Sequence, residues 1–263
     1  MRIATWNMKQ VAPKLGRSPG QRWDWMASQV DPDVVVLTEA KVPHGGPPQG
    51  WEAIWLPDGV GKRRRWGTVI AGRGVGLLEV TEVSKTFRTV PLRFEWPATV
   101  HVADVMVEGE RWGTVVGLYG ITLGPDGSSI GSGEYSVDIL MDQLRPLFRS
   151  SRRDRIVVAG DFNLLPARMA RTVAESGLID LVAMTASDRP LLVGCTGCDL
   201  GDGCGHMWTH RNTDRPGAAV QHLDYLLATP ELAREVTGVR GGVRDFPDAW
   251  EISDHAPVLA DFG

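Results

Sequence analysis

The sequence predicts an α/β fold in which two β-sheets pack face to face with helices outside. Short β-branched and aromatic runs recur along the chain and outnumber the helical patterns. Two of them, Val34–Thr38 and Ile156–Ala159, are continuous apolar runs typical of strands buried on both faces. About ten strands with few helices exceed one open sheet, so two packed sheets fit better.

The first half of the chain is predicted to be mostly strands. A helix is expected at Arg22–Val30, and Pro32 ends it because proline cannot continue a helix. Strands are expected at Ile3–Asn7, Val34–Thr38, Trp51–Leu56, Gly67–Ala71, Leu77–Val83, Thr89–Phe94, Val100–Val107 and Gly113–Tyr119.

The second half adds two longer helices. Tyr135–Phe148 has apolar residues at a helical period, and Pro146 is expected to kink or shorten its last turn. Ala167–Ser176 is a second helix, with Gly177 as its C-cap. The remaining strands are expected at Ile156–Ala159, Leu223–Ala228, Val236–Arg240 and Pro257–Phe262.

The composition is that of a globular protein, with 43% hydrophobic and 23% charged residues in 263. No long Pro, Gly or Ser linker divides the chain, so residues 1–263 are expected to form one domain. Lys and Arg number 28 against 32 Asp and Glu, which excludes an overall basic coat for nucleic acid. No apolar run is long enough to span a membrane, and no signal peptide is apparent, so we expect a cytoplasmic protein. The oligomeric state is not indicated.

Polar residues stand at the ends or starts of several predicted strands, where ordinary turn residues are expected. Each alone has a simple structural interpretation, such as an Asx-turn at Asp161. Together they supply carboxylates, amides, a phenol and imidazoles, which suit a divalent cation and the activation of water. The residues are Asn7, Glu39, Tyr119, Asp161, Asn163, His222, Asp224, Asp254 and His255.

These residues lie in motifs that resemble the endonuclease/exonuclease/phosphatase superfamily, which includes apurinic endonucleases, deoxyribonuclease-I-like enzymes, sphingomyelinases and inositol-polyphosphate phosphatases. The resemblance spans residues 1–263, and its most specific blocks are Gly160–Asn163 and Ser253–Val258. It implies a four-layered α/β sandwich of two mixed, mainly antiparallel sheets. The other matching blocks are Thr5–Asn7, Leu37–Glu39, Gly117–Tyr119 and Leu223–Tyr225.

The resemblance also implies a metal site. Glu39, with Asn7 and Asp254 nearby, would hold Mg²⁺ or Mn²⁺. Such an ion polarises a phosphoryl oxygen and offsets developing charge.

Catalytic roles follow from the same resemblance. Asp161 would orient or deprotonate the attacking water, and Asn163 would hydrogen-bond the phosphate. His255 would act on the phosphate or the nucleophile, with Asp224 orienting it. Tyr119 would stabilise the transition state or the leaving oxygen.

Three departures from apurinic endonucleases argue against a dedicated abasic-site activity, though not against phosphoester hydrolysis. Met8-Lys9-Gln10 follows the first Asn, where an acidic or small residue and a Gly are usual. Thr122 stands where Asn is usual, and His222 where Arg or Lys is common.

All three cysteines lie in one glycine-rich segment, an insertion at about residues 194–210. Cys195, Cys198, Cys204 and His206 make a closed tetrahedral set for structural zinc, with His210 as a competing ligand. The alternative is a loop with free thiols, or a Cys195–Cys204 disulfide in an oxidising setting.

Lys62–Trp66 is the one dense basic run, and Arg64 and Arg65 are candidates for contacting a phosphate backbone. The alternative is a solvated loop. Trp66, Trp208 and Trp250 lie in predicted loops at the catalytic rim and could contact a base.

The sequence thus predicts a Mg²⁺-dependent phosphodiesterase, in first place a nuclease that cleaves DNA or RNA. A phosphatase or phosphodiesterase for a small molecule or lipid headgroup is the alternative, and the net charge of −4 favours it mildly. A non-catalytic binding protein on the same scaffold is a third interpretation, against which the complete residue set argues.

Overall fold

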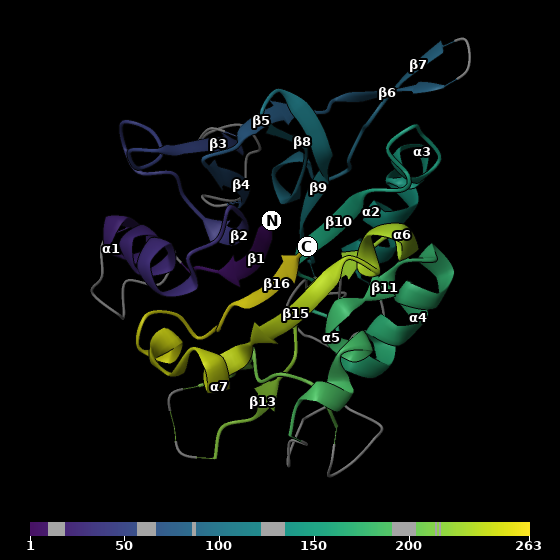
Figure 1. Cartoon of the computed structure of the whole chain (residues 1–263). Helices are drawn as coiled ribbons and strands as arrows, with labels where there is room; N and C mark the ends of the chain where they lie inside the picture. Colours follow the sequence, from purple (N-terminus) through teal and green to yellow (C-terminus); the bar gives the residue numbers. More distant parts are fainter. Residues whose placement is uncertain are drawn as a thin grey trace.

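The computed structural model describes residues 1–9, 19–56, 67–85, 88–121, 135–190, 204–213, 215 and 217–263. Within them, two six-stranded sheets form the centre of the molecule (Figure 1). The first sheet contains, in spatial order, β15 (Val236–Gly241), β16 (Val258–Phe262), β1 (Arg2–Asn7), β2 (Val34–Ala40), β4 (Gly67–Arg73) and β3 (Trp51–Trp55). The second contains β11 (Ile179–Asp180), β14 (Asp224–Ala228), β10 (Ile156–Asp161), β9 (Glu110–Tyr119), β8 (Val100–Val107) and β5 (Gly76–Glu79).

Each sheet has one parallel pair at its centre, β1 with β2 and β9 with β10, and its other pairings are antiparallel. The ends of the two parallel strands therefore lie at one edge in each sheet. Because β14 runs antiparallel to β10, its first residue, Asp224, pairs with the last residue of β10, Asp161. In the same way, the segment that enters β16 lies beside the end of β1.

Helices cover the outer faces of both sheets, which confirms the predicted α/β sandwich. On the first sheet, α1 (Pro19–Trp25) continues into a π-helical turn, η2 (Met26–Val30), and packs with η5 (Pro247–Glu251), which follows the short helix α7 (Gly242–Asp245). On the second lie α2 (Ser136–Gln143), α3 (Arg145–Phe148) and α4 (Pro166–Ser176). Shorter elements are η3 (Pro97–Thr99), α5 (Leu181–Met184), η4 (Ala186–Asp188), α6 (Pro230–Ala233), and the ribbons β6–β7 (Glu82–Lys85, Arg88–Pro91) and β12–β13 (His210–Arg211, Val220–Gln221).

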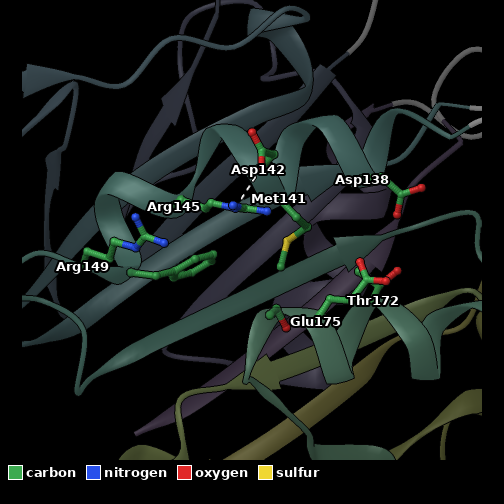
Figure 2. Close-up of a pocket in the computed structure, with 9 residues that line it drawn as sticks. Asp138, Met141, Asp142, Arg145, Arg149, Thr172 and Glu175 are labelled. Atoms are coloured by element: carbon green, nitrogen blue, oxygen red, sulfur yellow. Dashed lines mark ion pairs between the residues drawn. The ribbon is translucent and has the colours of Figure 1, made fainter.

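An open groove of about 420 Å³ separates α2 and α3 from α4 on this outer layer (Figure 2). Its lining is mostly charged and includes the ion pair of Arg145 with Asp142. None of the residues predicted for the site lines this groove. Among the described helices, none is both long and apolar enough to cross a bilayer.

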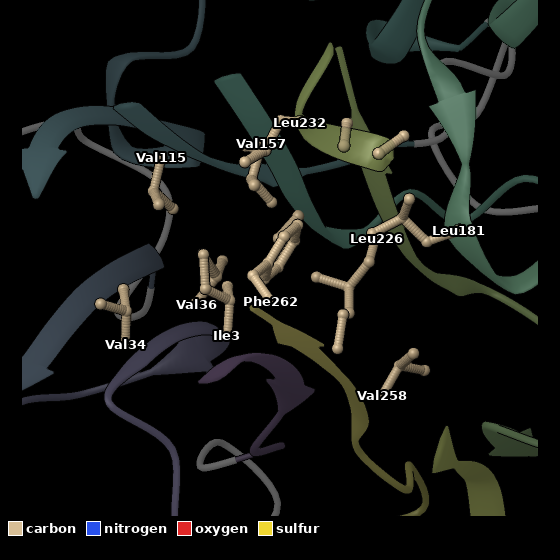
Figure 3. Close-up of a cluster of buried hydrophobic side chains, with 14 of the residues drawn as sticks. Ile3, Val34, Val36, Val115, Val157, Leu181, Leu226, Leu232, Val258 and Phe262 are labelled. Atoms are coloured by element: carbon tan, nitrogen blue, oxygen red, sulfur yellow. The ribbon is translucent and has the colours of Figure 1, made fainter. Parts of the chain in front are cut away.

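The core between the sheets is a layer of buried, mainly aliphatic side chains from both inner faces (Figure 3). Val34 and Val36 of the first sheet face this layer, as do Val115, Val157 and Leu226 of the second. Each such side chain contributes about 1.5–3 kcal/mol when removed from water. This layer fixes the position of one sheet against the other.

One predicted strand is divided in the structure. The expected strand Leu77–Val83 is two strands, β5 and β6, which belong to different sheets. The disruption expected from Pro146 in the helix Tyr135–Phe148 is confirmed: α2 ends before Leu144, and α3 begins anew with Pro146 in its first turn, because proline lacks the N–H that would continue α2. The predicted cap at Gly177 is confirmed, with φ of +73°.

Candidate active site

Polar side chains from both sheets meet at the edge where the central parallel strands end. Asn7 ends β1, and Glu39 is the penultimate residue of β2. Tyr119 and Asp161 end β9 and β10, and Asp224 begins β14. The topology therefore collects residues that are far apart in the sequence.

Three hydrogen bonds at this edge run from one sheet to the other. Asn7 Nδ2 donates to Asp161 Oδ2 (2.8 Å), Tyr119 Oη to Glu39 Oε1 (3.0 Å), and the ring Nδ1 of His255, just before β16, to Asp224 Oδ2 (2.8 Å). All six residues except Glu39 are buried. The side chains are thus held in place by each other as well as by their strands.

Glu39 has an unusual backbone conformation. Its φ is +45°, and the pairing of β2 with β4 shifts between Leu37 and Ala40. A left-handed conformation costs a non-glycine residue about 1–2 kcal/mol. Such irregularities re-aim side chains near functional sites, and here the carboxylate turns toward Asn7 Nδ2 (3.3 Å) as well as Tyr119.

The turn after β10 is shaped by its own residues. A Cβ on Gly160 would lie 1.7 Å from the carbonyl oxygen of Leu118, so only glycine fits there. Asp161 Oδ1 accepts the backbone N–H of Asn163 (2.9 Å), and Asn163 adopts a φ of +52°. The Asn163 amide donates to the carbonyl of Gly120 (2.9 Å) and to Asp161 Oδ2 (3.3 Å). In this structure Asn163 therefore positions Asp161.

Asp161, Asp224 and His255 form a buried charge cluster, with one ligand atom from each within 4.8 Å of the others. Burial raises the pKa of Asp161 to about 7, although His255 opposes this. Burial alone lowers the pKa of His255, but the charges of Asp224 and Asp161 outweigh it and raise the pKa to about 10. At neutral pH the cluster thus combines an imidazolium with a carboxyl group near its own pKa.

The types of donor atom at this edge suit a hard divalent cation. Glu39 and Asp254 offer carboxylate oxygens and Asn7 an amide oxygen, which suit Mg²⁺ or Mn²⁺. Asp254 Oδ1 is buried and has no hydrogen-bond partner among the described residues, as expected of an atom reserved for a cation. Asp254 Oδ2 is paired with the ammonium group of Lys9.

Two neighbours of the site were not predicted as catalytic residues. The ring of His210 lies 4.5 Å from that of His255, its Nδ1 bonds Gln221 Oε1 (2.9 Å), and its Nε2 is 3.9 Å from Asp254 Oδ2. Burial and then the charge of His255 lower the pKa of His210 to about 4, so it is neutral at pH 7. Lys9 is the other. His210 appeared in the sequence only as a competing zinc ligand, and Lys9 only as a departure from a motif.

Other predicted residues lie apart from this cluster or outside the described residues. Trp208 lines a small hollow with His206 and Arg244. Cys204 is fully buried, and His206 stacks on His222 with ring centroids 5.6 Å apart. Trp250 packs under the Arg211 guanidinium at 5.0 Å. Outside the described residues lie Cys195, Cys198, Arg64, Arg65 and Trp66.

The family described as the Endonuclease/Exonuclease/phosphatase family matches residues 4–255, nearly the whole chain. The chain belongs to the endonuclease/exonuclease/phosphatase family. The enzymes of this family hydrolyse phosphoester bonds, and the match contains every residue of the cluster. Comparison with curated proteins gives no significant match.

Solved structures of proteins with low sequence identity have the same fold as this member of the endonuclease/exonuclease/phosphatase family. It is similar to an AP endonuclease, LMAP, from Leishmania major (TM-score 0.65, 15% identity, covering 98% of this chain and 86% of that one). It is also similar to TDP2 from D. rerio complexed with single-strand DNA product (0.62, 17%, 100% and 98%). A third is the 3' phosphatase NExo from Neisseria bound to a product DNA hairpin (0.60, 18%, 100% and 99%).

Proposed function

We propose that this chain is a divalent-metal-dependent phosphodiesterase that cleaves nucleic acid. The observation that carries the proposal is the convergence of Asp161, Asp224 and His255 beside Glu39 and Asn7. These groups can take a proton from water, donate one to a phosphate, and hold a cation. Nucleic acid as the substrate is supported by two structural neighbours whose structures contain DNA products.

The protein's own residues divide the work. Asp161, with a pKa near 7, accepts a proton from the attacking water. His255, kept protonated and oriented by Asp224, donates its Nε2–H to the phosphate. Tyr119, next to Glu39, stabilises the leaving oxygen.

Glu39, Asp254 and Asn7 would hold the divalent cation. When bound, it supplies Lewis acidity that offsets negative charge on the phosphate. A structural zinc ion on Cys195, Cys198, Cys204 and His206, and a cytoplasmic location, stay predictions.

The test is a cleavage assay on single- and double-stranded DNA and RNA with Mg²⁺ or Mn²⁺. We expect cleavage that EDTA abolishes and that His255→Ala reduces by about 1,000-fold or more. No cleavage of any member of the panel, by protein shown to be folded, contradicts the proposal.

A small phosphoester substrate is the second candidate, favoured by the net charge of −4. Salt separates the two, because binding of a nucleic acid backbone weakens steeply with salt and the KM of a small substrate changes little. Hydrolysis of bis-p-nitrophenyl phosphate excludes a non-catalytic binding protein.

A further inference from the structure

The two oxygens of Asp254 have different surroundings. Oδ2 carries the ion pair with the Lys9 ammonium, and Oδ1 is buried without a partner among the described residues. The Asp254 side chain is 15% exposed, whereas that of Lys9 is 36% exposed. One oxygen is therefore already neutralised by a cation of the chain itself, and the other is a buried acceptor without a partner among the described residues, as a second cation would require.

Lys9 is held in this position through its backbone. Its N–H donates to Asn7 Oδ1 (2.9 Å), and its carbonyl accepts from Nη1 of the buried Arg22 (2.9 Å). Its φ of +44° is a left-handed conformation that such contacts must maintain. Both sides of the Lys9 backbone are therefore fixed, and the side chain starts from a defined point from which its ammonium group reaches Asp254.

We propose that Lys9 is a second, built-in cation of the metal centre. Asp254 binds the divalent ion through Oδ1 and the Lys9 ammonium through Oδ2, and the ammonium of this partly exposed side chain binds a phosphoryl oxygen of the substrate. This inference rests on the proposed function. According to this inference, one divalent ion and one ammonium group together bind each phosphate group of the substrate.

The two positive charges have opposite consequences for metal and substrate. They repel each other across one carboxylate, so Lys9 weakens binding of the divalent ion. Both attract the phosphate, so Lys9 strengthens substrate binding and catalysis. Removing the ammonium should therefore improve metal binding while it impairs turnover.

The experiment measures Mn²⁺ affinity of the whole chain without substrate, by isothermal titration or by the EPR signal of free Mn²⁺. We expect Lys9→Met to bind Mn²⁺ about tenfold more tightly and to lose about 100-fold in kcat/KM. Lys9→Arg, which keeps the charge, should retain the affinity for Mn²⁺ of the unchanged chain.

A second neutral variant guards against misfolding. Lys9→Asn suits the left-handed backbone better than other residues with side chains, and it should also raise Mn²⁺ affinity. A residue with only a structural role would lower metal binding and turnover together. If the unchanged chain binds Mn²⁺ and cleaves a substrate, but neither neutral variant binds Mn²⁺ more tightly, the inference is wrong. If the unchanged chain does neither, the proposed function fails instead.

Discussion

At the scale of single residues, the Asp224–His255 pair controls the charge available to a phosphate. Asp224 is fully buried, and its Oδ2 accepts the His255 Nδ1–H, which leaves Nε2 directed toward Asp161, 3.9 Å away. The negative charge of Asp224 is thus the largest of the influences that keep this buried imidazole protonated, and that of Asp161 adds to it.

Asp224→Asn removes that charge and preserves the size of the side chain. We expect kcat to fall by about 1,000-fold or more, with a much smaller change in KM, in steady-state kinetics. The melting temperature of the variant is the control for folding. A loss of less than tenfold in kcat would show that Asp224 has no orienting role.

His222 gives a prediction about acid stability. It is fully buried, its Nδ1 donates to the carbonyl of Met207 (3.1 Å), and burial lowers its pKa to about 3. The unfolded chain takes up this proton near pH 6.5 and the folded chain does not, so stability falls as the pH drops through this range. The loss amounts to about 3 kcal/mol between pH 7.5 and 4.5.

The check is urea unfolding of the unchanged chain and of His222→Asn, whose amide can still donate to Met207. The variant should be less stable at pH 7.5, but its stability should fall less on acidification. Parallel losses in the two proteins would mean that His222 does not titrate on unfolding.

At the scale of elements, the close contact of Gly160 with β9 is what allows β10 to end beside Tyr119. Gly160→Ala places a methyl group against the Leu118 carbonyl, and we expect a loss of more than about 4 kcal/mol in the free energy of unfolding. Gly177→Ala is the matched control, since Gly177 also has a positive φ but open space around it. That change should cost about 1 kcal/mol. Similar losses in both variants would contradict the steric argument.

Element type was predictable where hydrophobic pattern alone decides it. Runs such as Val34–Thr38 and Ile156–Ala159 became central strands because continuous apolar residues are stable only between two layers. The split of Leu77–Val83 was not predictable, since strand pairing with β8 or β7 depends on tertiary contacts that a local pattern does not contain.

The same limit applies to the site. Residues in recognisable motifs, such as Asp161 and His255, could be selected from the sequence. Lys9 and His210 could not, because their meaning comes only from their proximity to Asp254, which lies over 40 positions away in the sequence from either. Convergence of this kind is a product of topology.

At the scale of the whole molecule, an acidic protein must attract nucleic acid through local cations. Arg211 lies at the site, where its backbone N–H donates to the Asp254 carbonyl (3.0 Å) and its guanidinium stacks on Trp250. Arg211→Ala should reduce by about one the slope of log KM against log salt for a nucleic acid substrate. Arg145→Ala, in the groove of Figure 2, is the surface control and should leave the slope unchanged. Equal slopes for the unchanged chain and both variants would mean that Arg211 does not contact the phosphate backbone.

The hydrogen bonds between the two sheets make the rate of catalysis sensitive to the alignment of one sheet with the other. Each of the three hydrogen bonds joins a residue of one sheet to a residue of the other. A small displacement of one sheet relative to the other therefore misaligns all of them at once. Val157→Ala, which leaves a void between the layers, should therefore lower kcat at temperatures where circular dichroism still reports a folded chain. In this molecule the aliphatic core stabilises the fold and also keeps the active-site residues of the two sheets aligned.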